Sequence, residues 1–211
     1  MKNYPYIVVE GNIGSGKTSL VKLLTKEFSS HSIYEEFSEN PFLPKFYKEP
    51  NKYAFPLELS FLAERYHQLK KELNTRNLFH TNTISDYYFI KSLIFAEITL
   101  PEDEFDLYKK LFNIIYQKLP QPDIFIYLYS DVERLQKNIR KRGRDYENQI
   151  TDEYLTKIHK GYFNFLNQQN SFPVLILNLT NIDFVQQKED FIKILVSLGE
   201  TYEKGLHRIN Y

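Results

Sequence analysis

The sequence predicts an α/β fold in which a parallel β-sheet is covered by helices on both faces. Short continuous runs of apolar and β-branched residues alternate with longer segments whose apolar residues recur at helical spacing. The short runs lack the polar alternation of a strand with one exposed face, as expected for a sheet buried on both sides. A length of 211 residues suits one domain, residues 1–211, with a sizeable core.

Five segments are predicted to be strands, since each is a short apolar run bounded by turn-forming or polar residues. They cover residues 4–11, 32–37, 81–89, 123–131 and 173–180. The helical pattern is typified by Leu20, Val21, Leu23 and Leu24, which follow the first strand. The predicted helices cover residues 16–28, 57–73, 91–98, 104–119, 132–143, 152–169 and 185–206. Residues 40–56 are rich in proline and aromatic residues and are expected to form a loop with a short helix.

Composition excludes several classes of protein. The 27 basic and 27 acidic residues balance, so no field of one sign favours nucleic acid or a membrane surface as partner. The absence of cysteine excludes disulfides, a thiolate nucleophile and cysteine-based metal sites. No apolar run reaches the roughly 18 residues of a membrane span, and no signal peptide is visible. A soluble, cytoplasmic protein is therefore expected.

A phosphate-binding motif follows the first strand. Gly11, Gly16, Lys17 and Thr18 match the pattern G-x-x-x-x-G-K-[ST] of a P-loop. The glycines let backbone N–H groups face phosphate oxygens, and the next helix presents its positive N-terminus to the same anion. Lys17 would reach the β- and γ-phosphates, and Thr18 would bind Mg²⁺. The expected ATP-binding residues of this loop are Gly11, Asn12, Ile13, Gly14, Ser15, Gly16, Lys17 and Thr18.

Further segments resemble the deoxynucleoside kinase family, which includes deoxycytidine, deoxyguanosine and deoxyadenosine kinases. They are EGNIGSGKTS, EEFSENPFL, FYKEPNKYAFPLELSFLAERYHQLK, SDYYF and RKRGRDYE, in the family's order and spacing. The resemblance spans about residues 6–165, and bacterial deoxyadenosine kinases are similar in particular. It implies a P-loop kinase fold with five parallel strands, Mg-ATP as donor, the 5′-hydroxyl of a deoxynucleoside as acceptor, and a homodimer.

The resemblance assigns two catalytic carboxylates. Glu36 matches the family glutamate that accepts the proton of the 5′-hydroxyl, with its neighbour Glu35 as the alternative. Asp86 directly follows the run TNTIS in the third predicted strand segment, where a carboxylate can bind Mg²⁺ and take part in catalysis. The family carries an arginine directly after this acidic residue, whereas this chain has Tyr87. Either Tyr87 orients the acceptor groups through a hydrogen bond, or an arginine from elsewhere substitutes.

Five further positions match family residues that bind the nucleoside. Tyr47 and Glu147 correspond to residues that contact the sugar 3′-hydroxyl, and Phe95 to one that stacks on the base. Glu58 and Arg65 lie two helical turns apart on one face, and together they suit a purine. Guanine matches them better by number of hydrogen bonds. Because deoxyadenosine kinases are common among bacterial relatives, deoxyadenosine is expected ahead of deoxyguanosine.

An arginine-rich stretch is predicted to form a lid over the phosphates at about residues 138–150. Arg140, Arg142 and Arg144 are concentrated there in an otherwise neutral chain, and guanidinium groups suit phosphate oxygens. Arg142 and Arg144 are the favoured contacts, with Arg142 as a catalytic residue.

Three alternatives to a deoxypurine kinase remain open. Within the family, a deoxycytidine kinase or one of broad specificity is possible. A thymidylate-type nucleoside monophosphate kinase is disfavoured, because it needs basic residues near Glu36 and the segment is acidic. A nucleotide-dependent switch is disfavoured because the guanine-reading motif N-K-x-D is absent and the lid would be out of place.

Overall fold

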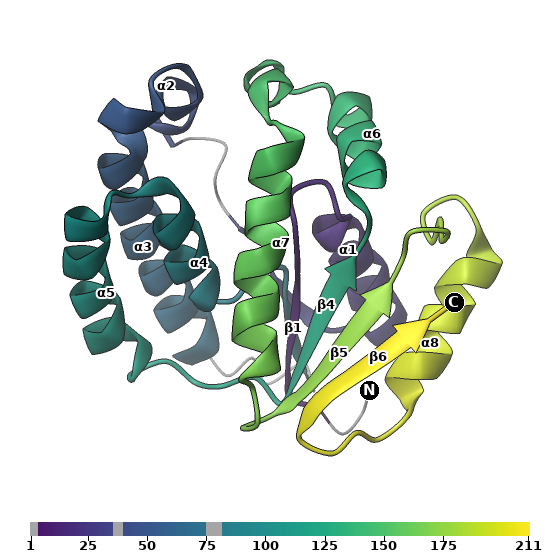
Figure 1. The fold of residues 1–211 in the computed structure, drawn as a ribbon. Helices are drawn as coiled ribbons and strands as arrows, with labels where there is room; N and C mark the ends of the chain where they lie inside the picture. Colours follow the sequence, from purple (N-terminus) through teal and green to yellow (C-terminus); the bar gives the residue numbers. More distant parts are fainter. Residues whose placement is uncertain (1–3, 36–39, 75–81) are drawn as a thin grey trace.

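The computed structural model describes residues 4–35, 40–74 and 82–211 and has six parallel strands in the order β2-β3-β1-β4-β5-β6. Figure 1 shows this sheet with helices on both faces. The predicted α/β class is therefore confirmed. The strands are β1 (Tyr6–Gly11), β2 (His31–Ile33), β3 (Thr83–Ser85), β4 (Ile124–Tyr129), β5 (Pro173–Asn178) and β6 (Gly205–Asn210). The helices are α1 (Lys17–Phe28), α2 (Leu43–Lys48), α3 (Pro50–Asn74), α4 (Ile90–Thr99), α5 (Glu102–Tyr116), α6 (Val132–Arg142), α7 (Asp152–Asn167) and α8 (Lys188–Gly199), with a 3₁₀ helix, η1 (Asp145–Gln149).

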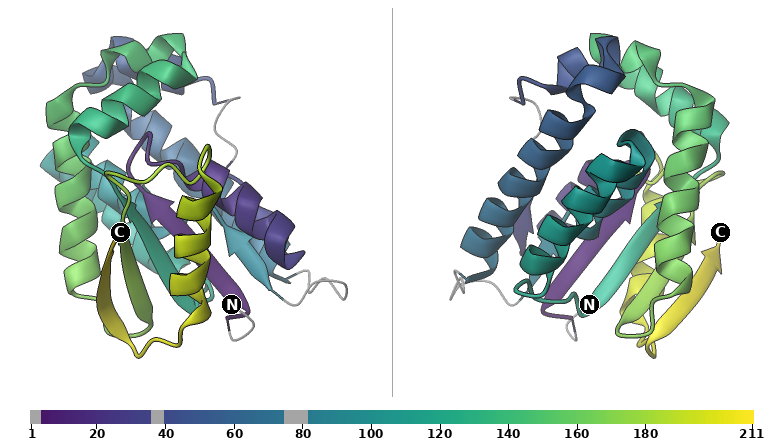
Figure 2. Two further views of the ribbon diagram at one scale, coloured as in Figure 1. Left: turned by 90° about the vertical axis from the view of Figure 1, so that its right-hand side faces the viewer. Right: turned by 60° about the vertical axis from the view of Figure 1, so that its left-hand side comes forward.

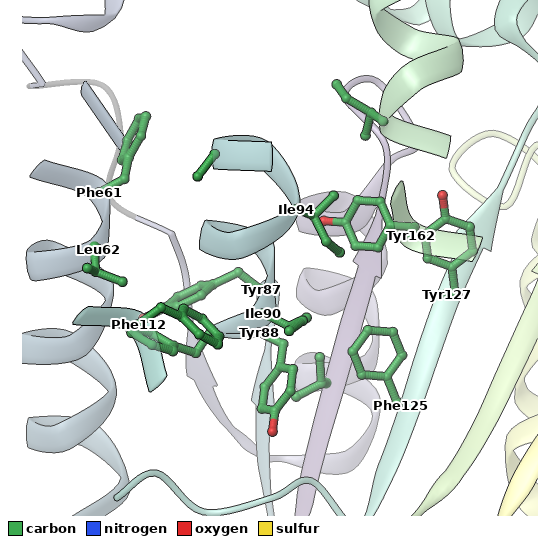
Figure 3. Close-up of a cluster of buried hydrophobic side chains, with 14 of the residues drawn as sticks. Phe61, Leu62, Tyr87, Tyr88, Ile90, Ile94, Phe112, Phe125, Tyr127 and Tyr162 are labelled. Carbon is green, nitrogen blue, oxygen red and sulfur yellow. The ribbon is translucent and has the colours of Figure 1, made fainter. Parts of the chain in front are cut away.

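Two hydrophobic cores lie on opposite faces of the sheet. Successive side chains of a strand point to opposite faces, so Ile7 and Val9 of β1 join one core and Val8 the other. The core around Ile7 and Val9 includes apolar side chains of α1 and α8. The core around Val8 is larger and aromatic, and it includes side chains of α3, α4, α5 and α7. Figure 3 shows part of it, with Tyr87, Tyr88 and Phe112 among its members.

The sheet has six strands rather than the five expected. The helix predicted over residues 185–206 ends at Gly199, and β6 follows as an edge strand beside β5 (Figure 2). Leu206 packs against the aromatic core and Ile209 against the opposite one, so the strand is anchored on both faces. The short run GLHRIN has no continuous apolar stretch, and its side chains are half-buried or exposed, so it lacks the sequence pattern of a buried strand.

Residues 40–56 are more helical than expected. They form α2 and the first turns of α3, which continues without a break through Pro56. Proline inside a helix removes one backbone hydrogen bond and normally breaks or kinks it. Here Ala54 and Leu57, on either side of Pro56, are buried in the aromatic core, and their burial offsets that loss.

The carboxyl ends of the strands gather the polar side chains. Parallel strands end at the same edge, so the loop after β1, Glu35 after β2 and Asp86 after β3 come together there. Glu36 follows directly but lies outside the described residues. Within the part of the chain that the structure describes, no helix is both long enough and apolar enough to cross a membrane.

Candidate active site

A pocket of about 370 Å³ lies at the carboxyl ends of β1, β2 and β3. Its volume falls in the range of pockets that bind small molecules. The residues that line it come from the P-loop, from the segment that follows β2, from helices α2, α3 and α4, and from the region of η1. Its polar members are Lys17, Thr18, Ser19, Glu35, Glu58, Arg65, Asp86, Lys91, Arg142, Arg144 and Glu147.

The P-loop has the backbone of a phosphate cradle. Gly14 and Gly16 have φ values of 81° and 90°, in the left-handed region that favours glycine. A Cβ atom on Gly14 would lie 2.8 Å from the carbonyl oxygen of Leu135, so a side chain there meets backbone as well as strain. Lys17 Nζ donates to the carbonyl oxygens of Gly11 and Asn12, at 2.8 and 2.9 Å. The lysine is thus folded over the loop where phosphate oxygens would bind.

The remaining P-loop residues divide between the pocket and the support beneath it. Ile13, Gly14 and Gly16 line the pocket. The buried Asn12 side chain donates to the carbonyl oxygen of Leu155 and accepts from the backbone N–H of Ile13, which ties the loop to α7. These contacts hold the loop against α7.

The residues expected to hold Mg²⁺ are in contact. Thr18 Oγ1 donates to Asp86 Oδ2 at 2.7 Å, at the first turn of α1. A hydroxyl and a carboxylate are oxygen ligands of the kind that Mg²⁺ prefers, with its remaining ligands supplied by phosphates and water. The described residues contain no group of three or more histidine, cysteine, aspartate or glutamate side chains that would form a metal cage. The donor set therefore fits a nucleotide-bound Mg²⁺.

Glu35 is the carboxylate at the centre of the site. Its Oε1 accepts from Arg65 Nε and Nη2, at 2.9 and 2.7 Å, and its Oε2 accepts from Lys91 Nζ at 2.5 Å. Its backbone N–H donates to Asp86 Oδ1 at 2.7 Å. Burial alone would raise the pKa of Glu35, but the charges of Lys91 and Arg65 outweigh it and hold the pKa at about 2. The carboxylate is therefore ionised under all ordinary conditions.

Glu58 and Arg65 share a face of α3 but have different partners. Arg65 uses three of its nitrogens on Glu35 and on the Ser92 hydroxyl. Glu58 Oε1 accepts from Thr99 Oγ1 at 3.1 Å, whereas its buried Oε2 has no hydrogen-bond partner among the described residues. Burial raises the pKa of Glu58 to about 7. A buried oxygen without a partner is costly, so its position in the pocket wall points to a hydrogen-bonding ligand.

The arginine-rich segment and Tyr47 line the same pocket. Arg142 and Arg144 both bond to the buried carboxylate of Glu147, the closest contact being 2.6 Å from Arg142 Nη2. The ring of Tyr47 stacks on that of Tyr146, with centroids 5.9 Å apart. Figure 2 shows α2 and the η1 region at the same end of the molecule, beyond the sheet. Arg140, in contrast, is exposed on α6 and lies outside the pocket lining described above.

Comparison with known proteins agrees with this arrangement. A family model described as deoxynucleoside kinase matches residues 7–202. The chain belongs to the deoxynucleoside kinase family. It is 35% identical to a deoxyguanosine kinase of Bacillus subtilis (strain 168), over 95% of this chain and 99% of that protein. It is 30% identical to a deoxyadenosine/deoxycytidine kinase of the same organism, over 90% and 89%.

A solved structure extends the likeness to the fold. Deoxyadenosine kinase from M. mycoides with bound dATP superposes with a TM-score of 0.79 at 25% identity, covering 92% of this chain and all of that one. The P-loop kinase type of fold is thus confirmed for this member of the deoxynucleoside kinase family. Its relatives are named as kinases, so the chain is a phosphotransferase.

Sequence reasoning does not place Glu35 and Lys91 at the centre of the site in this member of the deoxynucleoside kinase family. The sequence predicts Glu35 only as the alternative to Glu36, and it predicts no role for Lys91. A signal for Lys91 exists, since it is a lone cation at the start of the apolar helical run SLIFA. Tyr87 is not part of the site, because its hydroxyl donates to Gln68 Oε1 and its ring is buried in the aromatic core. Phe95 lines the pocket, as expected of a residue that could stack on a base.

Proposed function

We propose that this chain transfers the γ-phosphoryl group of ATP to the 5′-hydroxyl of a purine deoxynucleoside. The observation that supports this most is an unbroken series of contacts across the pocket. Thr18 bonds to Asp86, Asp86 to the backbone of Glu35, and Glu35 to Arg65, which shares a helix face with Glu58. A phosphate cradle, a buried carboxylate and a polar wall for a base therefore follow one another.

The P-loop and the lid would bind the donor. Lys17, the backbone N–H groups of the loop and the α1 N-terminus suit the triphosphate, with Arg142 and Arg144 approaching from the other side. Mg²⁺ bound by Thr18 and Asp86 would neutralise phosphate charge. When triphosphate oxygens are present they compete for the two arginines, which Glu147 holds in this structure.

The acceptor side would work through Glu35. Its ionised carboxylate would accept a hydrogen bond from the 5′-hydroxyl, direct its oxygen at the γ-phosphorus and take the proton as the new P–O bond forms. The two cations beside the acceptor, Arg65 and Lys91, both bond to Glu35, and the carboxyl groups of Asp86 and Glu58 line the same pocket. The side chains of the acceptor side thus balance its positive charge without an acceptor phosphate, which favours a hydroxyl acceptor over thymidylate.

Glu58 supports a purine, with guanine ahead of adenine. An ionised carboxylate accepts from two donors, and guanine offers N1–H and N2–H on one edge, whereas adenine offers only its N6 amine. The expectation of deoxyadenosine from the sequence rests on its bacterial relatives, whereas Glu58 and Arg65 together match guanine better by number of hydrogen bonds. Because Arg65 is engaged by Glu35 and Ser92, the base edge is left to Glu58, and this favours deoxyguanosine. Tyr47 and Glu147, which both line the pocket and lie close enough for the charge of Glu147 to act on Tyr47, suit the sugar 3′-hydroxyl.

A substrate panel tests the function. We expect ATP-dependent turnover with deoxyguanosine and deoxyadenosine, and at least tenfold lower kcat/KM with deoxycytidine and thymidine, because their edges match Glu58 less well. The measurement is a coupled ADP-release assay with each deoxynucleoside, with the deoxynucleoside monophosphates as controls. Turnover that depends on thymidylate, with none on any nucleoside, would show that the acceptor is a phosphate and the proposal wrong.

We also propose that the chain forms a homodimer, as its family resemblance suggests, and that helix α5 forms the interface. Leu107, Leu111 and Ile114 recur at i, i+4 and i+7 on that helix and are 51%, 36% and 61% exposed. A contiguous exposed apolar stripe on a soluble domain marks a contact surface. Replacing both Leu107 and Ile114 by glutamate is expected to give a monomer in size-exclusion chromatography with light scattering.

The exposed apolar residues of α8 provide the control for that experiment. Ile192 and Val196 are 46% and 63% exposed, so glutamate at both positions makes the same change in charge on another helix. This variant should remain dimeric. A monomeric wild-type chain, or dissociation by the α8 variant alone, contradicts the proposed interface.

A further inference from the structure

Lys91 is a buried cation to which the reaction as described assigns no task. It lies in the first turn of α4, is 8% exposed, and lines the pocket. Its Nζ atom donates to Glu35 Oε2 and lies 5.6 Å from the centroid of the Phe95 ring, so the ammonium is held from two sides. A lysine loses substantial solvation on burial, and one retained beside a functional carboxylate calls for a reason.

The place of Lys91 in the chain supplies that reason. The family resemblance implies an arginine directly after Asp86, where this chain has Tyr87. The Tyr87 ring is buried in the aromatic core, and its hydroxyl donates to Gln68 Oε1. Position 87 therefore supplies no cation to the pocket. Figure 3 shows Tyr87 within this core. Lys91, four residues further on and in the first turn of the adjoining helix α4, brings a positive charge to Glu35 from the same segment.

The charge of Lys91 acts on the donor site as well as on the acceptor carboxylate. Burial first, and the charge of Lys91 second, lower the pKa of Lys17 to about 8, so the two lysines are near enough to repel one another. The other charged groups around Glu35 and Lys91 are Glu10 of β1, Lys17 of α1, Glu58 and Arg65 of α3, and Asp86 after β3.

We propose that Lys91 takes over the task of the missing arginine as the positioning residue for Glu35, an inference that rests on the proposed function. Arg65 holds Oε1 from one side and Lys91 holds Oε2 from the other, so the carboxylate has a single orientation. A fixed orientation serves phosphoryl transfer, which depends on positioning and charge rather than on a strong base.

Removal of the charge tests the proposal. Lys91→Met is expected to lower kcat about 10²-fold, the effect of a misplaced reacting group, with a smaller change in the KM for the nucleoside. Loss of one cation leaves burial to raise the pKa of Glu35. Glu35 is then protonated at higher pH than in the wild type, so an acid limb should appear in the pH profile of kcat. Lys91→Arg should recover at least tenfold of the lost kcat and remove that limb.

Controls separate this role from a structural one. Lys109→Met, on the exposed face of α5, removes a lysine away from the pocket and should leave kcat and its pH profile unchanged. Lys91→Gln keeps a hydrogen-bond donor without the charge and provides a second variant should Lys91→Met not fold by circular dichroism. It is expected to show the same acid limb.

Two results would overturn the proposal. One is wild-type kcat and an unshifted profile in the uncharged variants. The other is a loss of kcat with an unshifted profile that arginine does not recover, which would mean that Lys91 only supports the fold. Wild-type turnover measured in the same assay distinguishes failure of the proposed function from failure of the proposed role of Lys91. Without any turnover on deoxynucleosides the proposed function fails, whereas turnover that is insensitive to Lys91 removes only this inference.

Discussion

Replacing Glu35 by glutamine is expected to lower kcat by about 10³-fold, within the range for loss of a general base. The glutamine amide cannot take the proton of the 5′-hydroxyl, and it leaves Arg65 and Lys91 without a counter-charge. The side chain keeps its size, so the pocket keeps its shape and the nucleoside should still bind. Steady-state kinetics with deoxyguanosine give kcat, and isothermal titration with the same nucleoside gives its Kd.

Glu36 provides the matched control for this experiment. The family resemblance assigns the general base to Glu36, whereas the contacts with Arg65 and Lys91 favour Glu35. Glu36→Gln therefore makes the same chemical change one residue away. Glu36→Gln is expected to retain kcat within about threefold, because this variant keeps the Glu35 carboxylate that would accept the proton. Loss of turnover in Glu36→Gln, with turnover kept in Glu35→Gln, would return the base to Glu36.

A folding check belongs with the Glu35 variant. Removing one partner of a buried ion pair leaves the other charge uncompensated and costs about 3–5 kcal/mol in general. Glu35→Asp keeps the charge with a shorter side chain, and it should melt closer to the wild type while still losing kcat. If Glu35→Gln and Glu35→Asp both lose kcat but only Glu35→Gln lowers the melting temperature, the loss of kcat is not caused by destabilisation of the fold.

The parts of the fold and site that the sequence predicts are those fixed by local pattern. The P-loop follows from a strand, a run of glycines and a helix that are contiguous in the chain, and its backbone has the expected left-handed glycines. The continuous apolar runs of β4 and β5 likewise predict that these strands are buried, as they are in the structure. In each case neighbouring residues contain the whole signal.

The parts that the sequence does not predict depend on distant contacts. Strand β6 exists because β5 offers an unpaired edge and because Leu206 and Ile209 find a core on each face. The choice between Glu35 and its neighbour depends on Arg65 and Lys91, which come from two other helices. The role of Arg65 changes for the same reason, since spacing on α3 places it beside Glu58 and only the fold shows Glu35 within its reach. Hydrophobic periodicity contains no information on such pairings.

Replacing Glu58 by glutamine is expected to shift the preference between purines toward adenine by about tenfold to 10²-fold in the ratio of kcat/KM values. The amide has one donor and one acceptor on its edge, which complement N1 and the N6 amine of adenine. Guanine presents two donors to that edge and would leave one facing the amide N–H. Competition between deoxyguanosine and deoxyadenosine in one reaction, with both monophosphates quantified, measures the ratio directly.

The same carboxyl group predicts a pH dependence of base choice in the wild type. With a pKa of about 7, Glu58 is ionised above that pH and accepts two hydrogen bonds, as guanine requires. Below it, the protonated group donates through O–H to N1 of adenine and accepts from N6, so it resembles glutamine. The ratio of deoxyguanosine to deoxyadenosine turnover should therefore rise from about pH 6 to about pH 8. The charged groups that act on Glu58 are Arg65, Lys91 and Glu35.

Glu58→Gln removes this dependence if Glu58 is its source, because the amide does not titrate. The wild-type ratio should change across the pH range while the variant ratio stays flat at its adenine-favouring value. Glu64→Gln, a matched change on an exposed position of the same helix, should behave as the wild type. An equal pH dependence in Glu58→Gln would place its origin in another group, and an unchanged purine ratio in that variant would mean that Glu58 does not contact the base. Because Glu58 Oε2 has no partner among the described residues, a polar base edge is the contact that would relieve its burial, and this makes base choice the property most sensitive to that carboxylate.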